Sequence, residues 1–247
     1  MNTHIRPNIF QQFPNIIAAE STRYGGVSPN PYASLNLGSN TDDLTENVER
    51  NREILFNDLK IPLEKVVFNQ QIHGDNILVA TQSGNYSGYD ALISNKRNVF
   101  LTIGIADCTP ILLYDKENWV CAAIHAGWKG TTQRILVKTM MHMAIEFGTT
   151  PENCFAYIGT CIDDCSFEVD ADVADIFEED FKRWDAEKGK FFVDLKKANL
   201  QQLLEVGVPK EQIEISPYST VLNNEDYFSY RKEGGTTGRI MVVIGST

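Results

Sequence analysis

The stretch Val99–Gly127, VFLTIGIADCTPILLYDKENWVCAAIHAG, decides the fold. It predicts three short strands, at Val99–Ile105, Pro110–Tyr114 and Trp119–His125, because three apolar runs are separated by turn-forming residues. These three strands and three expected before them, at Val66–Ile72, Ile77–Thr81 and Ala91–Ser94, have the close spacing that is typical of hairpins rather than of strand–helix–strand units. The centre of the chain is therefore expected to be a β-sheet region.

Further strands and several helices are expected on both sides of this stretch. The additional strands are Ile16–Ser21, Val66–Ile72, Ile77–Thr81, Ala91–Ser94, Cys154–Ile162 and Ile240–Ile244. The expected helices run from a Thr41–Asp43 cap to just before Pro62, from Thr131 to Phe147 with a Gly148 cap, over Asp172–Phe181 and over Leu195–Val206. No linker divides the chain, so we predict a single α+β domain over residues 1–247.

The charge balance of the chain argues against two classes of binding partner. The 247 residues contain 22 Lys and Arg against 33 Asp and Glu, which gives a net charge of −11. This balance argues against a nucleic acid or an anionic membrane as partner, because both attract basic surfaces. No stretch approaches the about 20 apolar residues of a membrane span. The first 20 residues lack a signal-peptide pattern and the five Cys are not densely spaced, so a cytoplasmic location with free thiols is expected.

Three metal-competent residues stand at strand ends. The chain has four His, of which His73 and His125 each lie beside a glycine, and Cys108 lies between them. Two imidazoles and one thiol are the kind of set that holds catalytic zinc with one open position. The same residues also fit a Cys–His nucleophile pair. A third interpretation is ordinary: hydrogen-bonded His and a buried Cys.

The glycine-rich segments give weaker signals. Gly127–Thr132 opens a helix, so its backbone N–H groups and Lys129 could hold an anion, although a tight turn explains the same residues. Gly234–Arg239 lacks the Lys and Ser/Thr of a phosphate-binding loop. Cys161 and Cys165 have no second pair, which argues against a structural zinc site.

The motifs together resemble the YfiH-type family, which carries the labels multicopper polyphenol oxidoreductase (laccase-like) and purine nucleoside phosphorylase. The resemblance covers nearly the whole chain and rests on several motifs in fixed order. They are Thr22–Ser28 (TRYGGVS), Pro31–Gly38 (PYASLNLG), Asn51-Arg52, Gln70–Gly74 (QQIHG), Ala106–Pro110 (ADCTP), His125–Thr131 (HAGWKGT), Phe167–Val169 (FEV), Phe228–Arg231 (FSYR) and Thr237–Arg239 (TGR).

The resemblance implies a fold, a cofactor and an activity. The fold would be an α/β sandwich with two mixed β-sheets flanked by helices, and His73, Cys108 and His125 would bind one zinc ion. The activity would be phosphorolysis of adenosine, inosine, guanosine and methylthioadenosine, together with deamination of adenosine. The chain departs from the family at Thr160, Asp163, Asp164, Ser166 and Ser219, where the family has prolines, a glycine and cysteines. These departures are expected to affect substrate preference more than metal binding.

Each activity places its own demand on the residues. Deamination needs a water whose pKa zinc lowers to about 7 and a group that shuttles protons. Asp107 is the first candidate for that acid/base and Asp75 the second. Asp107 also has a structural interpretation, because neighbouring strand residues point to opposite faces. Gln71 is a candidate to read the base edge.

Phosphorolysis needs donors for phosphate, for which arginine is well suited. The candidates are Arg23, Arg52, Arg231 and Arg239, with Lys129 as a further option.

Three other functions stay open at this point. A copper-binding, laccase-like oxidoreductase is disfavoured because a blue-copper site plus a trinuclear cluster needs more than four His, although copper could bind the two-His, one-Cys set. A hydrolase could use Cys108 as nucleophile on a cell-wall precursor or another amide. The chain could also bind a metal without catalysis. The sequence does not predict an oligomeric state.

Overall fold

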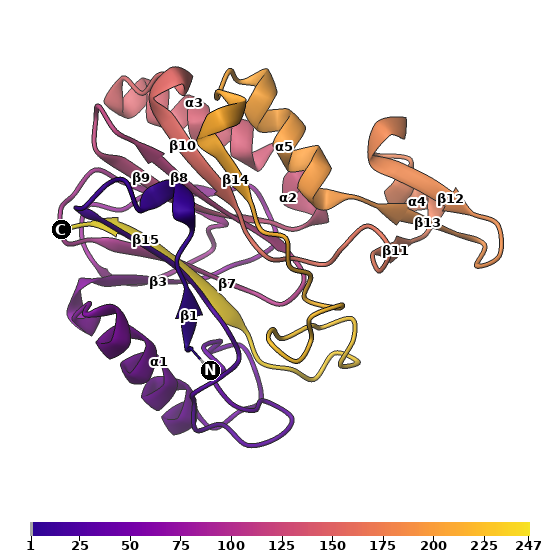
Figure 1. Ribbon diagram of the computed structural model, residues 1–247, viewed down its shortest axis with the longest axis horizontal. Coiled ribbons are helices and arrows are strands. Elements are labelled where there is room, and N and C mark those ends of the chain that lie inside the picture. The colour runs from indigo at the N-terminus through magenta and orange to yellow at the C-terminus, as the bar shows by residue number, and fades with distance from the viewer. Residues whose placement is uncertain (1) are drawn as a thin grey trace.

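Two mixed β-sheets form the centre of the protein in a computed structural model, which describes residues 2–247 (Figure 1). The first sheet has the order β1-β2-β15-β7-β3-β5, with β1 at His4–Ile5, β2 at Ile16–Ser21, β15 at Ile240–Ser246, β7 at Phe100–Ile105, β3 at Val66–Gln70 and β5 at Gly84–Ser87. The second has the order β14-β10-β8-β9-β6-β4, with β14 at Ile213–Ile215, β10 at Cys154–Ile158, β8 at Thr109–Asp115, β9 at Val120–Ala126, β6 at Ala91–Ser94 and β4 at Ile77–Val79. Both sheets combine parallel and antiparallel neighbours.

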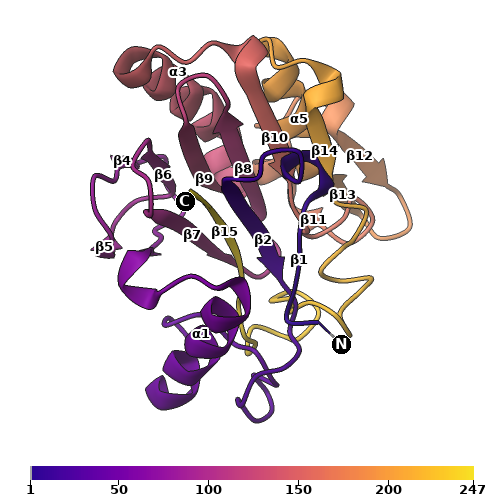
Figure 2. The same ribbon diagram turned by 60° about the vertical axis from the view of Figure 1, so that its left-hand side comes forward.

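The two sheets pack face to face, with helices on their outer faces (Figure 2). Between the sheets, residues of β7 such as Leu101 and Ile103 share a buried cluster with Leu112 of β8. The first sheet is covered by α1 (Thr45–Leu59), and the second by α3 (Ile135–Phe147) and α5 (Leu195–Glu205). These layers confirm the predicted α+β sandwich.

A smaller sheet stands beside the sandwich. It has the order β11-β13-β12, with β11 at Glu168–Val169, β13 at Lys190–Val193 and β12 at Lys182–Asp185, and α4 (Ala171–Ala174) lies next to it. Figure 1 shows these elements projecting on one side of the molecule. Short 3-10 turns connect the larger elements at Asn8–Phe10, Leu63–Lys65, Pro151–Asn153, Glu179–Phe181 and Lys210–Gln212.

Two helix predictions were wrong. The helix expected over 131–147 is two helices, α2 (Trp128–Thr132) and α3, because Arg134 between them has a left-handed backbone with φ of 59°. The helix expected over 172–181 is only α4 followed by a 3-10 turn. Glu178, Glu179 and Asp180 are exposed acidic residues, so this stretch lacks the buried apolar face that would stabilise a longer helix.

Two further details differ from the sequence prediction. The start of α1 is capped one residue later than expected: Leu44 is the N-cap, and the Asp43 carboxylate accepts the Leu44 backbone N–H at 2.9 Å. Of the strands predicted as hairpins, β8 and β9 do pair as one, whereas β3 pairs with β7 and β4 with β6 in parallel. The intervening chain switches between sheets, which a local apolar pattern does not reveal. No helix within residues 2–247 has the length and apolar character needed to cross a membrane.

Candidate active site

The two sheets bring His73, Cys108 and His125 together. His73 follows β3 of the first sheet, Cys108 precedes β8 in the crossover from the first sheet to the second, and His125 lies in β9. In the β8–β9 hairpin, Pro110 faces His125 and Thr109 faces Ala126, so Cys108 comes next to Gly127. A Cβ atom at Gly127 would lie only 2.9 Å from the Cys108 Sγ. The glycine therefore leaves the space that the thiol occupies.

The three side chains form one compact donor set. One ligand atom from each residue lies within 4.8 Å of the other two. The His73 and His125 rings pack edge to face with centroids 4.8 Å apart. His125 is buried, Cys108 is half-buried and His73 is exposed. The set is thus open to a ligand on the side of His73.

Asp90, the residue just before β6, orients two members of the set. Its Oδ1 lies 2.8 Å from Nδ1 of His125, which leaves Nε2 of that ring facing Cys108. Asp90 also accepts the backbone N–H groups of His73 at 3.0 Å and Gly74 at 2.8 Å. The Asp90 side chain is fully buried. Although burial opposes its charge, these hydrogen bonds and the charge of His125 hold its pKa below the ordinary value.

The electrostatics favour a thiolate at Cys108. Burial alone would raise the pKa of the thiol, but the charges and hydrogen bonds of His125 and His73 lower it. Burial likewise opposes protonation of His125, yet the Cys108 thiolate and the Asp90 carboxylate raise its pKa. A metal binds the thiolate and the neutral imidazole, so metal binding would release the proton that this ion pair holds on His125.

The residues therefore fit a metal ion. Two imidazole nitrogens and one thiolate give a borderline-soft donor set that suits zinc or copper, and the open side leaves room for a further ligand. The Asp90–His125 hydrogen bond is the kind of second contact that fixes the orientation of a metal-binding histidine.

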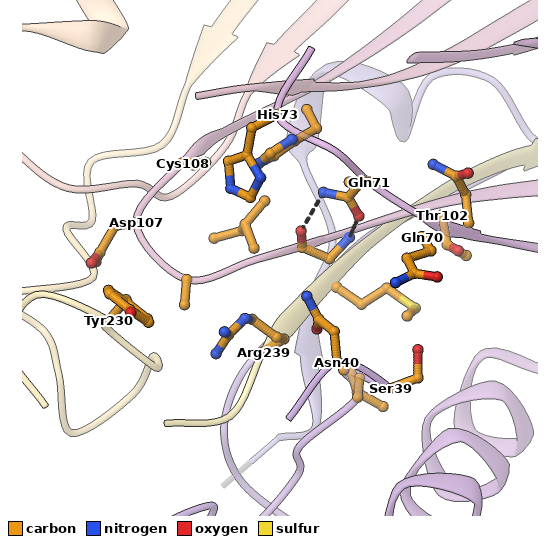
Figure 3. Close-up of a pocket in the computed structure, with 18 of the residues that line it drawn as sticks. Ser39, Asn40, Gln70, Gln71, His73, Thr102, Asp107, Cys108, Tyr230 and Arg239 are labelled. Carbon is orange, nitrogen blue, oxygen red and sulfur yellow. Dashed lines mark hydrogen bonds between the residues drawn. The ribbon is translucent and has the colours of Figure 1, made fainter. Parts of the chain in front are cut away.

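A cavity of about 630 Å³ extends from this donor set along the outer face of the first sheet. Trp128, Ile162 and Phe167 share an apolar cluster that lines the cavity near the donor set, because the Ile162 N–H donates to the carbonyl of Asp107, next to Cys108. The other end of the cavity is lined by polar and apolar side chains that include Ser39, Asn40, Phe68, Gln70 and Thr102. Figure 3 shows His73 and Cys108 at one end, Ser39, Gln70 and Thr102 at the other, and Arg239 between them. Such a size and mixed lining are typical of small-molecule sites.

Two predicted site residues line the cavity but are occupied by structural hydrogen bonds. The Gln71 amide donates to the Gly104 carbonyl at 2.8 Å and accepts the Gly104 N–H at 3.0 Å (Figure 3). Asp107 has a left-handed backbone with φ of 88°. Its carboxylate accepts the hydroxyls of Thr220 and Ser229 at 2.6 and 2.7 Å and the Arg231 N–H at 2.6 Å. These contacts favour the structural interpretation of Asp107.

The predicted cations divide into two groups. Arg52, Arg231 and Arg239 line the cavity, whereas Arg23 and Lys129 are not among its lining residues. Lys129 is exposed, with its Nζ 5.5 Å from the Trp128 ring centroid. Asp75, the second acid/base candidate, forms an ion pair with Lys138.

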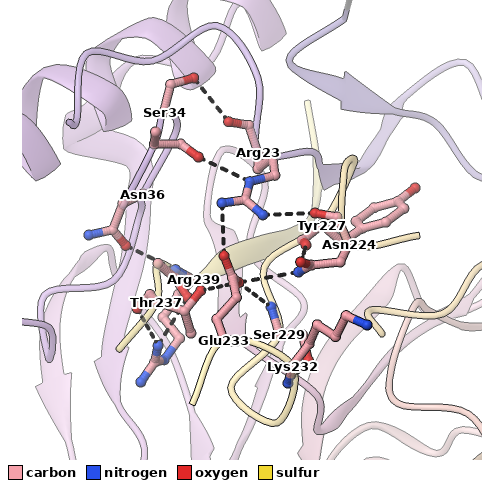
Figure 4. A network of polar contacts seen from close by, with 12 residues as sticks. Arg23, Ser34, Asn36, Asn224, Tyr227, Ser229, Lys232, Glu233, Thr237 and Arg239 are labelled. Carbon is pink, nitrogen blue, oxygen red and sulfur yellow. Dashed lines mark hydrogen bonds and ion pairs between the residues drawn. The ribbon is translucent and has the colours of Figure 1, made fainter. Parts of the chain in front are cut away.

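Arg23 belongs to a polar network that joins the first loop to the C-terminal loop (Figure 4). Its guanidinium donates to the carbonyls of Ala33 at 3.0 Å and Asn224 at 2.7 Å, and pairs with Glu233 at 3.0 Å. It also stacks over the Phe228 ring at 4.4 Å. All three nitrogen atoms are engaged, so this arginine stabilises the fold.

Three of the five departures from the family pattern, Asp163, Ser166 and Ser219, contact one another. Asp163 accepts the Cys165 N–H and the Ser166 hydroxyl, both at 3.0 Å, and also the Ser219 hydroxyl. Thr160 donates its N–H to Glu20 at 2.9 Å. The polar residues that replace the glycine and the two cysteines thus form a hydrogen-bonded group beside the cavity residue Ile162.

Asp90 and the amides at the far end of the cavity were missed by sequence reasoning. A single Asp before an apolar strand resembles many turn residues, and only the pairing of β6 with β9 brings it to His125. The QQIHG motif did contain Gln70, whose side chain lines the cavity while that of Gln71 is engaged by Gly104.

Comparisons with known proteins agree with this geometry. Residues 17–247 match the family model described as multi-copper polyphenol oxidoreductase laccase. A purine nucleoside phosphorylase of Bacteroides thetaiotaomicron is 37% identical over 93% of this chain and 91% of its own length. The crystal structure of a hypothetical protein YfiH of Bacillus licheniformis has a TM-score of 0.94 and 30% identity, and covers 100% of this chain and 97% of its own. The crystal structure of YlmD from Geobacillus stearothermophilus has a TM-score of 0.93 and 31% identity, with 99% and 96% covered.

Proposed function

Because the chain belongs to the multi-copper polyphenol oxidoreductase laccase family, whose members include relatives named purine nucleoside phosphorylase, we propose that it cleaves purine nucleosides with phosphate. The observation that carries this proposal is the placement of the His73–Cys108–His125 donor set at one end of a cavity that also contains unpaired arginines. That arrangement offers a metal site, a surface for a flat base and donors for phosphate in one space.

The reaction would exchange one bond for another. An oxygen of phosphate bonds to C1′ of the ribose while the bond from C1′ to N9 of the purine breaks. The electron pair of the broken bond stays on the purine, which takes up a proton. Phosphate loses a proton at the same time, so the products are ribose 1-phosphate and the free base.

Apolar side chains near the donor set would hold the base. Trp128, Ile162 and Phe167 line this part of the cavity, and aromatic faces stack favourably on a purine. We propose adenosine, inosine, guanosine and methylthioadenosine as substrates. Deamination of adenosine is the second proposed activity, and it requires the purine C6 to lie at the donor set.

His73, Cys108 and His125 would hold the metal, for which zinc is our proposal. When bound, a divalent cation supplies Lewis acidity that polarises an oxygen or nitrogen of the substrate. Asp90 fixes the His125 ring and the backbone of His73, and Gly127 leaves space for the thiolate. Asp107 holds the C-terminal loop through Thr220 and Ser229, which supports a positioning role.

Residues 2–247 do not bring together the number of His side chains that the several copper sites of a laccase require. Of the four His, His4 pairs with Asp58 and His142 is exposed on α3, so only two imidazoles converge. Copper can bind the two-His, one-Cys set in place of zinc. We expect such binding to give a weak oxidase signal at most.

A second candidate follows from Cys108 itself. Its thiolate, between two imidazoles, also suits nucleophilic attack on an amide. A single experiment separates the two: phosphate-dependent release of hypoxanthine from inosine, measured before and after treatment with a metal chelator. The proposal predicts that turnover stops with chelation and returns when zinc is added. Hypoxanthine release that survives complete removal of the metal would contradict the role of the metal, and no release even from the metal-loaded protein would favour the amide hydrolase.

A further inference from the structure

Among the residues that the structure describes, none of the three arginines that line the cavity has a carboxylate partner, and Arg52 and Arg239 are the two whose guanidiniums keep a terminal nitrogen free of hydrogen bonds. Within residues 2–247, no Asp or Glu oxygen lies within 4.0 Å of the guanidinium of Arg52 or Arg239. By contrast, Arg23 pairs with Glu233, and Arg50 of the same helix as Arg52 pairs with Glu53. The two unpaired cations therefore differ from those that stabilise the fold.

Both guanidiniums are partly buried. Burial is the main cause that lowers the pKa of Arg52 and of Arg239, and nearby negative groups, such as Glu49 near Arg52, only partly compensate. A charge that has lost water without gaining a counter-charge costs free energy, which a bound anion would recover. Asp107 lies in the same cavity, but its carboxylate is engaged by Thr220, Ser229 and the Arg231 N–H.

The segment Leu37–Gly38 contacts the guanidinium of Arg52 and the backbone and stem of Arg239. The Leu37 carbonyl accepts Nε and Nη2 of Arg52 at 3.1 and 3.0 Å, and the Leu37 N–H donates to the Arg239 carbonyl at 3.1 Å. A Cβ atom at Gly38 would lie 2.4 Å from Cγ of Arg239, so the arginine stem packs directly against this glycine. The Arg52 guanidinium and the Arg239 stem thus both contact this one short segment of the cavity wall.

Donors remain free on both guanidiniums. Arg52 uses Nε and Nη2 on Leu37 and stacks over Phe68 at 4.4 Å, which leaves Nη1. Arg239 uses Nη1 on the carbonyls of Thr237 and Gly238, which leaves Nε and Nη2. Figure 3 shows the Arg239 guanidinium pointing toward Tyr230, with its Cζ 5.8 Å from the centroid of that ring.

We propose that Arg52 and Arg239 form a phosphate subsite in the cavity. The ligand is a phosphate group, supplied either as inorganic phosphate or as the phosphate ester of a nucleotide, and its choice over other anions rests on the proposed function. Arg23 takes no part, because the Glu233 network uses its donors. Arg231 is exposed and donates its two terminal nitrogens to the carbonyls of Ser166 and Glu168, so it shapes the cavity wall.

Calorimetric titration of the metal-loaded protein with inorganic phosphate alone tests the subsite. We expect saturable binding that weakens about 10- to 100-fold in Arg239→Gln and in Arg52→Gln, the loss typical of a charge-assisted hydrogen bond. Arg50→Gln, an equal change of charge on the same helix, should bind like the parent protein. The subsite would be overturned if the parent bound neither inorganic phosphate nor adenosine 5′-monophosphate, or if the Arg239, Arg52 and Arg50 variants bound both ligands with equal affinity.

A parallel titration with adenosine 5′-monophosphate and adenosine separates the two sources of phosphate. If the nucleotide alone depends on Arg239, the ligand is a phosphate ester. If inorganic phosphate depends on it, the ligand is the free ion. Gly38→Ala keeps both charges but displaces the Arg239 stem, so it should weaken phosphate binding with unchanged net charge.

The titration does not depend on turnover, which separates this proposal from the proposed function. Phosphate binding that requires Arg239 in a protein without phosphorolysis would contradict only the function. Phosphorolysis whose phosphate KM is unchanged in Arg239→Gln would contradict only the subsite.

Discussion

Oδ1 of Asp90 lies 2.8 Å from Nδ1 of His125, and the same carboxylate holds the backbone of the loop that carries His73. One buried side chain therefore fixes two members of the donor set, although Asp90 belongs neither to β3, which His73 follows, nor to β9, which carries His125. The relationship explains how a half-exposed group of three residues can be ordered before any metal binds.

Asp90→Asn should weaken metal binding about 10- to 100-fold, the range found when a hydrogen-bond partner of a metal ligand is lost. The amide can no longer accept every N–H that Asp90 now accepts, so the His125 ring and the His73 loop lose their common anchor. Competition with a chromogenic chelator measures the affinity. Asp115→Asn, which changes another buried carboxylate at the far end of β8, should retain the metal. Equal affinities in the two variants would show that Asp90 does not position the ligands.

Gly127→Ala should also reduce metal affinity, through space rather than charge. The added Cβ would lie 2.9 Å from the Cys108 Sγ and must displace the thiolate. Gly74→Ala is the matched control beside His73, because its Cβ would meet its nearest atom at an ordinary 3.6 Å. The metal content of the two purified variants, measured by elemental analysis, should be low in the first and near that of the parent in the second.

Arg23→Gln should lower stability and spare catalysis. Its guanidinium joins Ala33, Asn224 and Glu233, so its loss should cost about 1.5–3 kcal/mol of unfolding free energy. Urea unfolding measures this cost, and Arg50→Gln should change it little because the Arg50–Glu53 pair is exposed. If the Arg23→Gln variant had a raised KM for phosphate at a temperature where it is folded, Arg23 would have to contribute to substrate binding.

Glu20 should make stability depend on pH. It is fully buried on β2, its Oε2 accepts the Tyr157 hydroxyl and the Thr160 N–H, and burial raises its pKa. The folded state thus keeps a proton that the unfolded chain releases near its ordinary carboxyl pKa of about 4.3. Stability is greatest below that pH and falls by up to about 1.4 kcal/mol per unit as the pH rises toward the folded pKa.

Glu20→Gln has no proton to lose, so its unfolding free energy should lack this decline. Urea titrations at about pH 5 and about pH 7 would show the parent losing stability relative to the variant. Parallel pH profiles of the two proteins would mean that Glu20 is ionised in the folded state.

Much of the fold could be predicted from apolar periodicity. The strands at 91–94 and 100–105 and the helix at 195–205 follow local patterns that the structure confirms within a residue or two. The parallel pairings of β3 with β7 and of β4 with β6 could not be predicted, because they depend on which sheet each strand joins. The broken helix at Arg134 escaped prediction because nothing in its local sequence requires a left-handed residue.

The three residues of the donor set could be predicted from the sequence, but the residue that orients them, Asp90, could not. His73, Cys108 and His125 stand out as metal-competent residues at strand ends, and the geometry brings them together. Asp90 is invisible in sequence because its role depends on the β6–β9 pairing. The six cation and amide candidates for substrate binding come from motifs. A motif cannot show that Arg23 hydrogen-bonds Glu233 and that Gln71 hydrogen-bonds Gly104, contacts that stabilise the fold.

Product analysis of adenosine by mass spectrometry tests the central claim most directly. The metal-loaded protein is incubated with adenosine in buffer with and without phosphate, beside Cys108→Ser and the exposed-histidine control His142→Ala. We predict adenine and ribose 1-phosphate only when phosphate is present, in the parent and in His142→Ala but not in Cys108→Ser. Adenosine left unchanged by the metal-loaded parent protein with phosphate would contradict the account.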